Sequence, residues 1–128
     1  MTESEALIRS IVGAIRHDIR PLACAIDVVR KILFVDKIPM DDILVTKDVY
    51  RNVAKILSKK PAAVERNIER LANLCWDEML ANDLVHKYIG KHLSYIHEPR
   101  DMMIYLAFYL EFKRPFFEVI EDAPALLF

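Results

Sequence analysis

Glycine is scarce in this sequence, which holds only Gly13 and Gly90 among its 128 residues. Tight β-hairpin turns depend on glycine, and no segment alternates cleanly between apolar and polar residues. Both features argue against a β-sheet protein. We therefore predict an all-α fold, a compact helical domain of about six helices that spans residues 1–128.

Cysteine and long apolar runs are also rare. Cys24 and Cys75 lie within apolar stretches and lack the spacing of a metal site or of a secreted disulfide framework. Residues 1–16 lack the long apolar core of a signal peptide, and no apolar run approaches the roughly 20 residues that a membrane span requires. We expect a reduced, cytoplasmic protein without a membrane partner.

The sequence contains no recognisable set of catalytic or metal-binding residues. The four histidines are scattered, and no cysteine or carboxylate completes a ligand set around His17, His86, His92 or His97. No Ser/His/Asp or Cys/His arrangement and no phosphate-binding glycine loop can be recognised. We therefore expect no enzymatic activity, no metal and no other cofactor.

Excess charge is almost absent from the whole chain, whose net charge is −1 at pH 7. Residues 45–70 differ, because seven basic and three acidic side chains leave a local excess of four positive charges there. Local charge of this kind matters more for phosphate binding than the total does. A solvated helix surface is the alternative interpretation of the same pattern.

Helical periodicity begins at the N-terminus. Thr2 and Glu5 form a capping box in front of an amphipathic helix predicted over residues 1–16. Its apolar face comprises Leu7, Ile8, Ile11, Val12 and Ile15. Such a helix either packs on the rest of the domain or dimerises it, and packing is the more common use.

Two further helices are predicted before residue 58. Pro21 suits the first turn of a helix that runs to about Asp36. Thr46 is the expected N-cap of the next helix. The inward-facing positions of that helix are predicted to be Val49, Val53, Ile56 and Leu57.

A short basic turn containing Lys59 and Lys60 leads into a helix predicted over residues 61–80. The buried stripe of this helix is predicted to comprise Val64, Ile68, Leu71 and Cys75. Arg66 lies almost opposite that stripe. Two helices joined by a tight corner are the layout of a helix-turn-helix, whose second helix enters the major groove of DNA.

The C-terminal third is predicted to hold a short helix near residues 83–89 and a long helix over residues 99–112, which Pro115 ends. The long helix carries an aromatic stripe of Tyr105, Phe108, Tyr109 and Phe112. This stripe is interpreted as core, with a dimer face as the alternative. Residues 115–128 form an apolar and acidic tail without a secondary-structure prediction.

The stretch from Val64 to Trp76 carries a motif. It agrees with the pattern V-E-R-A-I-R-H-A-I-E-x-A-W at Val64, Glu65, Arg66, Ile68 and Trp76. A second pattern, I-T-K-x-L-Y-x-x-I-A-K, is similar to the upstream residues Ile43, Thr46, Lys47, Tyr50, Val53, Ala54 and Lys55. On these motifs, residues 20–114 resemble the DNA-binding effector domain of the stage-zero sporulation response regulators, which control endospore formation. The resemblance implies a helix-turn-helix that binds tandem DNA sites as a dimer.

The chain departs from that family at four polar positions. Glu69 replaces an arginine and Arg70 a histidine, while Ala62 and Ala63 replace a serine and an arginine. In the family, the residues that match Glu65 and Arg66 touch bases, as does the arginine replaced by Glu69. The resemblance therefore implies a different preferred DNA sequence. The family's phosphate-receiver domain has no counterpart before residue 20, so we expect no phosphorylation control of that type.

Two functions follow from these observations. In the first, the protein is a DNA-binding transcription regulator. Lys47, Lys59 and Lys60 contact phosphates, and Glu65, Arg66, Asn67 and Arg70 reach base edges. Glu69 lies at the DNA-binding position where the family has a base-reading arginine. Double-stranded DNA is then the partner, with a second copy or a full-length relative beside it. In the second, the protein is an interaction module that kept the fold, lost DNA binding and acts on such a relative. Glu69 and the two alanines favour the second function, whereas the basic patch favours the first.

Overall fold

The computed structural model describes residues 1–93 and 98–127. Within these ranges it contains seven α-helices and no strand, which confirms the all-α prediction. Short π-helical and 3-10 turns, labelled η, complete the chain. In order, the elements are α1 (Glu3–Val12), α2 (Arg20–Arg30), η1 (Lys31–Val35), η2 (Met40–Asp42), η3 (Val45–Tyr50), α3 (Arg51–Leu57), α4 (Pro61–Ala81), α5 (Val85–Tyr88), α6 (Pro99–Phe112), α7 (Phe116–Asp122) and η4 (Pro124–Leu127).

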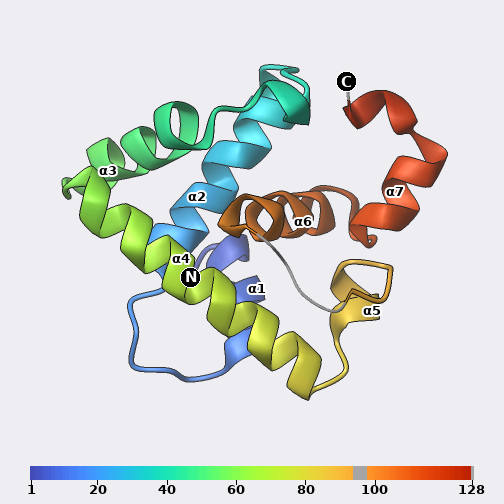
Figure 1. Ribbon diagram of the computed structural model, residues 1–128, viewed down its shortest axis with the longest axis horizontal. Coiled ribbons are helices and arrows are strands. Elements are labelled where there is room, and N and C mark those ends of the chain that lie inside the picture. The colour runs from blue at the N-terminus through green and yellow to red at the C-terminus, as the bar shows by residue number, and fades with distance from the viewer. Residues whose placement is uncertain (94–97, 128) are drawn as a thin grey trace.

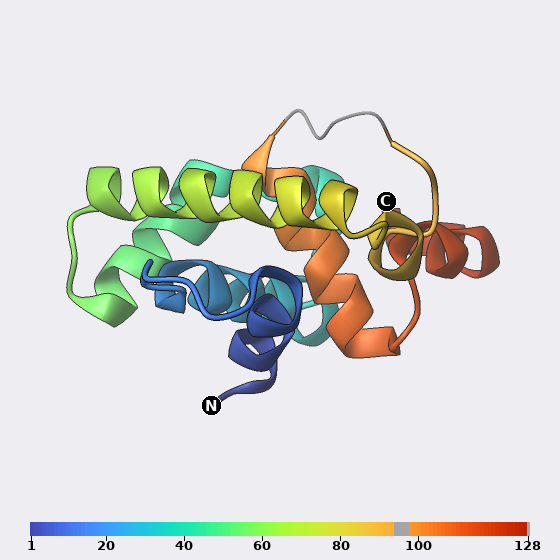
Figure 2. The same ribbon diagram turned by 90° about the horizontal axis from the view of Figure 1, so that it is seen from below.

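Helix α2 lies at the centre, and α1, α3, α4 and α6 all pack against it (Figure 1). Its Leu22, Ala25 and Ile26 are completely buried. A small alanine between larger aliphatic side chains lets neighbouring helices approach closely while the gaps stay filled. Helix α4 extends along one side of the molecule, with the segment that joins α1 to α2 and then α1 itself beneath it in Figure 2. The candidate site therefore lies on a helix whose back is fixed against the core.

The N-terminal helix is capped as predicted but ends early. The Thr2 hydroxyl accepts the Glu5 N–H, and the Glu5 carboxylate accepts the Thr2 N–H. Gly13 ends the helix with φ of 71°, and its N–H donates to Arg9 O. The predicted end at residue 16 is therefore wrong, because a positive φ that glycine adopts readily turns the chain away from the helix axis. Ile15 still packs partly buried against the core, from a loop rather than from the helix.

The second helix matches its prediction. Pro21 lies in its first turn, and η1 continues α2 directly to a C-cap at Asp36. The third helix begins differently, since Leu44 precedes the first turn of η3. The Asp48 carboxylate accepts the Leu44 N–H at 2.8 Å. Thr46 is therefore not the N-cap, because Asp48 supplies the acceptor for the exposed backbone group.

The buried face of the third helix is also partly different from the prediction. Val49 and Val53 are buried as predicted, together with Tyr50 and Ala54, but Ile56 is 61% exposed. Successive residues of an α-helix advance by about 100°, which puts Ile56 roughly 90° from the centre of that face. The apolar side chain of Ile56 thus lies at the solvent boundary.

Helix α6 spans the predicted residues, and its aromatic stripe belongs mainly to the core. Phe108 is completely buried, with ring centroids 5.2 Å from Phe34 and 4.9 Å from Phe116. Phe112 lies at the edge, where its ring contacts that of Phe34 at 5.3 Å. The tail forms α7 and η4, for which no helix was predicted.

The tail is held against the segment after α5. The Phe117 N–H donates to Ile89 O at 3.0 Å. Gly90 follows with φ of 91°, and a Cβ atom added there would lie 2.8 Å from Pro115 Cβ. Glycine is required at this position for both its backbone conformation and the close approach of Pro115.

Candidate functional site

Helix α4 carries most of the predicted site, and its boundaries agree with the prediction. Pro61 occupies the first turn, where its missing N–H costs nothing. Asn82 closes the helix, and its Nδ2 donates to Glu78 O at 3.0 Å. The predicted stripe of Val64, Ile68, Leu71 and Cys75 is buried. The register of α4, and with it the direction of every polar side chain, is fixed by this stripe.

The exposed side of α4, which we call the outer face, consists of Arg66, Glu69, Arg70, Asn73 and Asp77. These positions follow the i, i+3, i+4, i+7 and i+11 spacing of one helix side. Within the described part of the chain, neither guanidinium group on this face makes an intramolecular hydrogen bond or ion pair. Two cationic groups are therefore presented to solvent without an internal partner.

Glu65 and Asn67 are half-buried and lie on the two flanks of α4 rather than on the outer face. Side chains two positions apart are separated by about 200° around the helix axis, so Glu65 and Asn67 cannot point the same way. Glu65 on one flank and Glu69 at the adjoining edge of the outer face lie near Tyr50, where burial first and then their charges raise the pKa of Tyr50 to about 12. This flank is acidic.

The turn before α4 is short and structurally defined. Ser58 adopts a left-handed conformation with φ of 54°, and the Lys59 N–H donates to Ala54 O at 2.9 Å. Lys59 and Lys60 are exposed beside the start of α4. Lys47 lies in the first turn of η3, ten residues and hence roughly 15 Å of helix before the end of α3 at Leu57. The structure therefore groups Lys59 and Lys60 with Arg66, and Lys47 lies apart from them.

The loop of residues 13–19, called here the flanking loop, runs beside α4 and is fixed at both ends. Arg9 Nη1 donates to Gly13 O at 3.2 Å and to Ile15 O at 3.3 Å. At the other end Asp18 receives the Arg20 backbone N–H at 3.0 Å and the Arg20 guanidinium at 2.8 Å. Hydrogen bonds from Arg20 hold the pKa of Asp18 well below its usual range. The loop is thus preorganised.

Lys59 extends this anchor to the turn before α4. Its ammonium group donates to Asp18 Oδ2 at 3.4 Å. One carboxylate therefore ties the start of α2, the flanking loop and the turn together. One of the three lysines predicted to contact phosphate is already paired inside the molecule.

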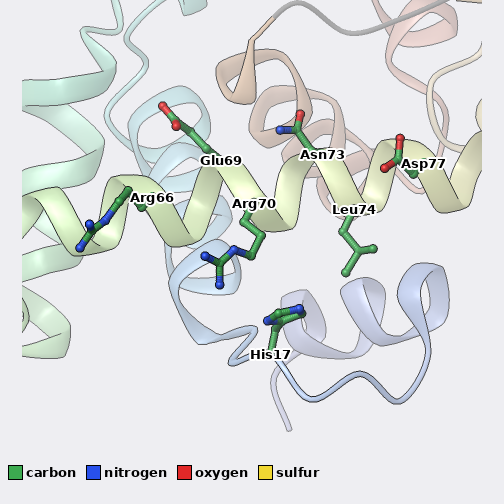
Figure 3. A pocket seen from close by; sticks show the side chains of 7 residues that line it. All are labelled: His17, Arg66, Glu69, Arg70, Asn73, Leu74 and Asp77. Carbon is green, nitrogen blue, oxygen red and sulfur yellow. The ribbon is translucent and has the colours of Figure 1, made fainter.

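A depression of about 550 Å³ lies between the flanking loop and α4 (Figure 3). His17 lines one side of it, and the outer face together with Leu74 lines the other. Arg70 and Leu74 point towards His17, whereas Glu69 points away from it. Sequence reasoning did not assign His17 to this face, because the residue belongs to another part of the chain. The polar run Arg16, His17 and Asp18 between two apolar helices was the only local signal.

The described residues form neither a metal centre nor a membrane-spanning helix. No group of three or more His, Cys, Asp or Glu residues that could hold a metal occurs in the described ranges. No helix in the same ranges is long and apolar enough to cross a membrane. Comparison with protein-family models, curated proteins and solved structures finds no match to this chain. The residues of α4 and its surroundings are therefore the basis on which a function can be proposed.

Proposed function

We propose that the protein is a sequence-specific DNA-binding transcription regulator whose helix α4 enters the major groove. One observation carries the proposal: the outer face of α4 exposes Arg66 and Arg70, and neither has a partner among the described residues. An α-helix with its side chains is about 10–12 Å across, which suits a major groove about 12 Å wide. The resemblance to the sporulation effector domains supports the same proposal and a cytoplasmic location.

Each side chain of the outer face has a role in this proposal. Arg66 donates to guanine O6 and N7, Glu69 accepts from cytosine N4, and Asn73 pairs with adenine, while Arg70, which points towards the flanking loop, contacts a phosphate. Lys59, Lys60 and the more distant Lys47 contact phosphates, which position the protein without reading sequence. Glu65 and Asn67 lie on the flanks, so they meet the groove walls rather than its floor.

A protein-interaction module is the second candidate, and two observations favour it. The flank with Glu65 and Glu69 places negative charge beside the helix that would approach DNA. Lys59 is already paired with Asp18. In this candidate function, the outer face binds a protein, for example a full-length relative or a second copy, through charge pairs with Arg66 and Arg70.

Selection of bound oligonucleotides from a random duplex pool tests the two candidates. DNA binding predicts an enriched motif, and a selected duplex then gives a salt dependence. About four to six phosphate contacts per protomer correspond to a log–log slope of roughly −4 to −5. Absence of duplex binding at low salt would remove the DNA-binding proposal and leave the interaction module.

A further inference from the structure

We infer that the depression between the flanking loop and α4 is a phosphate-binding site, filled by a phosphate of the DNA backbone and held by His17 and Arg70. The source of the phosphate rests on the proposed function, whereas the phosphate chemistry rests on the depression alone. His17 has no part in the helix-turn-helix interpretation. The inference adds a segment that lies before α2 to the DNA interface.

The groove geometry explains why this segment would meet the backbone. Because a helix nearly fills the width of the major groove, whatever adjoins its outer face lies over the phosphates that border the groove. The flanking loop adjoins that face on one side, as Figures 2 and 3 show. The opposite flank carries Glu65 and Glu69, which repel phosphates. Of the two DNA strands that border the groove, the one on the side of the flanking loop is therefore expected to contact the protein.

The donors that face the depression come from Arg70 and His17, which lie on opposite sides of it. The carboxylates of Glu69 and Asp77 also line the depression, but in Figure 3 both point away from His17. Arg70 supplies a positive charge and several N–H donors, and the His17 ring supplies at least one further N–H. The charge that faces the depression is therefore positive, and a phosphate, with several acceptor oxygens, suits these donors.

Other charged groups near His17 do not reverse this balance. Its sequence neighbours are Arg16, which is exposed, and Asp18, which is engaged by Arg20 and Lys59. Asp18 therefore directs its charge towards these two cations. The anchored ends of the loop hold His17 beside Arg70 before any ligand arrives, so ordering the site costs little on binding.

The test compares wild type, His17→Ala, His17→Gln and the control His86→Ala, an exposed histidine on α5. Duplex binding is measured over a range of salt concentrations. Loss of one hydrogen bond to the phosphate should make His17→Ala bind roughly three- to tenfold more weakly than wild type. His17→Gln keeps an N–H donor and should bind more tightly than His17→Ala. His86→Ala should match wild type.

Thermal melting excludes a folding defect, since His17 is exposed and its variants should melt with wild type. His17→Ala binding with wild-type affinity would overturn the inference while leaving DNA binding in place. A separate NMR titration of the protein alone uses inorganic phosphate. Saturable shifts of the His17 ring and of the Arg70 signals, the latter reduced in His17→Ala, support the phosphate site. If those shifts occur without duplex binding, a free phosphorylated ligand replaces DNA as the source and the proposed function fails. If they are absent, the site does not bind phosphate.

Discussion

Asp18 and Lys59 lie 41 positions apart in the sequence, yet the Lys59 ammonium donates to Asp18 Oδ2 across 3.4 Å. The same carboxylate receives the backbone N–H at the start of α2. The pair therefore links the position of the flanking loop to that of the turn before α4. A DNA phosphate would have to compete with the Asp18 carboxylate for the Lys59 ammonium group. The pair is therefore expected to affect both stability and DNA binding.

Substitution of Asp18 should change how stability depends on pH. The folded-state pKa of Asp18 is lowered, mainly by hydrogen bonds from Arg20. Its contribution is therefore present above the unfolded value of about 3.9 and is lost as the pH falls below it. The side chain is one-third exposed, so we expect Asp18→Asn to cost only about 0.5–1 kcal/mol at pH 6. Urea denaturation between pH 2.5 and 7 measures this difference, which should shrink towards the acidic end without vanishing, because the folded-state pKa lies below that range. Asp41→Asn, an exposed control, should have no effect, and equal curves for Asp18→Asn and wild type would contradict the prediction.

Arg66→Ala should separate recognition from folding. Because Arg66 is exposed and unpaired within the described residues, its removal should change the free energy of unfolding by no more than about 0.5 kcal/mol. Binding to a selected duplex should weaken by about 1–3 kcal/mol, with a relaxed preference at one base pair. Fluorescence anisotropy on matched and mismatched duplexes measures this loss. Lys87→Ala removes one exposed cation from α5 and should bind as wild type does. A large fall in melting temperature would instead make Arg66 a structural residue.

Glu69→Arg should tighten duplex binding if α4 meets DNA. The substitution changes the local charge by +2 on the outer face. We expect stronger nonspecific binding and a changed sequence preference. Glu121→Arg makes the same charge change on α7 and serves as the control. Equal tightening by both variants would indicate net charge rather than placement. Failure of both proteins, wild type and Glu69→Arg, to distinguish any selected duplex from scrambled duplex would favour the interaction module.

Gly90→Ala should destabilise the protein more than Gly13→Ala does. Both glycines have positive φ, so either alanine is strained by about 1 kcal/mol. Only at Gly90 does the added Cβ approach Pro115 Cβ to 2.8 Å. Relieving that overlap requires α7 to move, and we expect a further loss of about 1–3 kcal/mol. Midpoints of urea denaturation for the two variants measure the difference. Equal losses of stability in the two variants would show that Pro115 can move away from the added Cβ without destabilising the protein.

The two thiols should react at different rates in the native protein. Burial raises the pKa of Cys75 to about 12, so about one molecule in 10,000 carries its thiolate at pH 8. Cys24 is half-buried, and burial followed by the charge of Asp27 raises its pKa as well. A disulfide reagent should therefore label Cys24 slowly and Cys75 only after unfolding. Counting released thiolate with and without urea tests this, and Cys24→Ser should abolish the native reaction. A native reaction that persists in Cys24→Ser would show that α4 opens locally.

Periodicity and capping residues predicted most of the helices because both act locally. The capping box of Thr2 and Glu5, the start of α4 at Pro61 and the span of α6 all depend on residues within one or two turns. The errors arose where a neighbouring side chain or a backbone conformation, rather than the apolar pattern, decided the outcome. Asp48 displaced Thr46 as the cap of η3, and the glycine conformation at residue 13 ended α1 before the apolar pattern did.

In the candidate site, too, local features could be predicted and tertiary contacts could not. The outer face of α4 could be predicted, since one buried stripe fixes the opposite side of a helix. The sideways positions of Glu65 and Asn67 were not recognised, although they follow from the same angles. His17 and the pairing of Asp18 with Lys59 depend on tertiary packing, and nothing in the spacing of these residues predicts it. Local patterns located the helix but not its neighbours.

The packing of α6 against α2 has a consequence for synthesis on the ribosome. About 70 residues separate the end of α2 at Arg30 from the start of α6 at Pro99. At roughly 5–20 residues per second, α2 waits about 4–14 s before the helix that covers it has been made. During that interval one side of the central helix remains open to the surrounding medium. The nascent chain therefore exposes one buried side of α2 until α6 has been made, and chaperones can bind that side in the meantime.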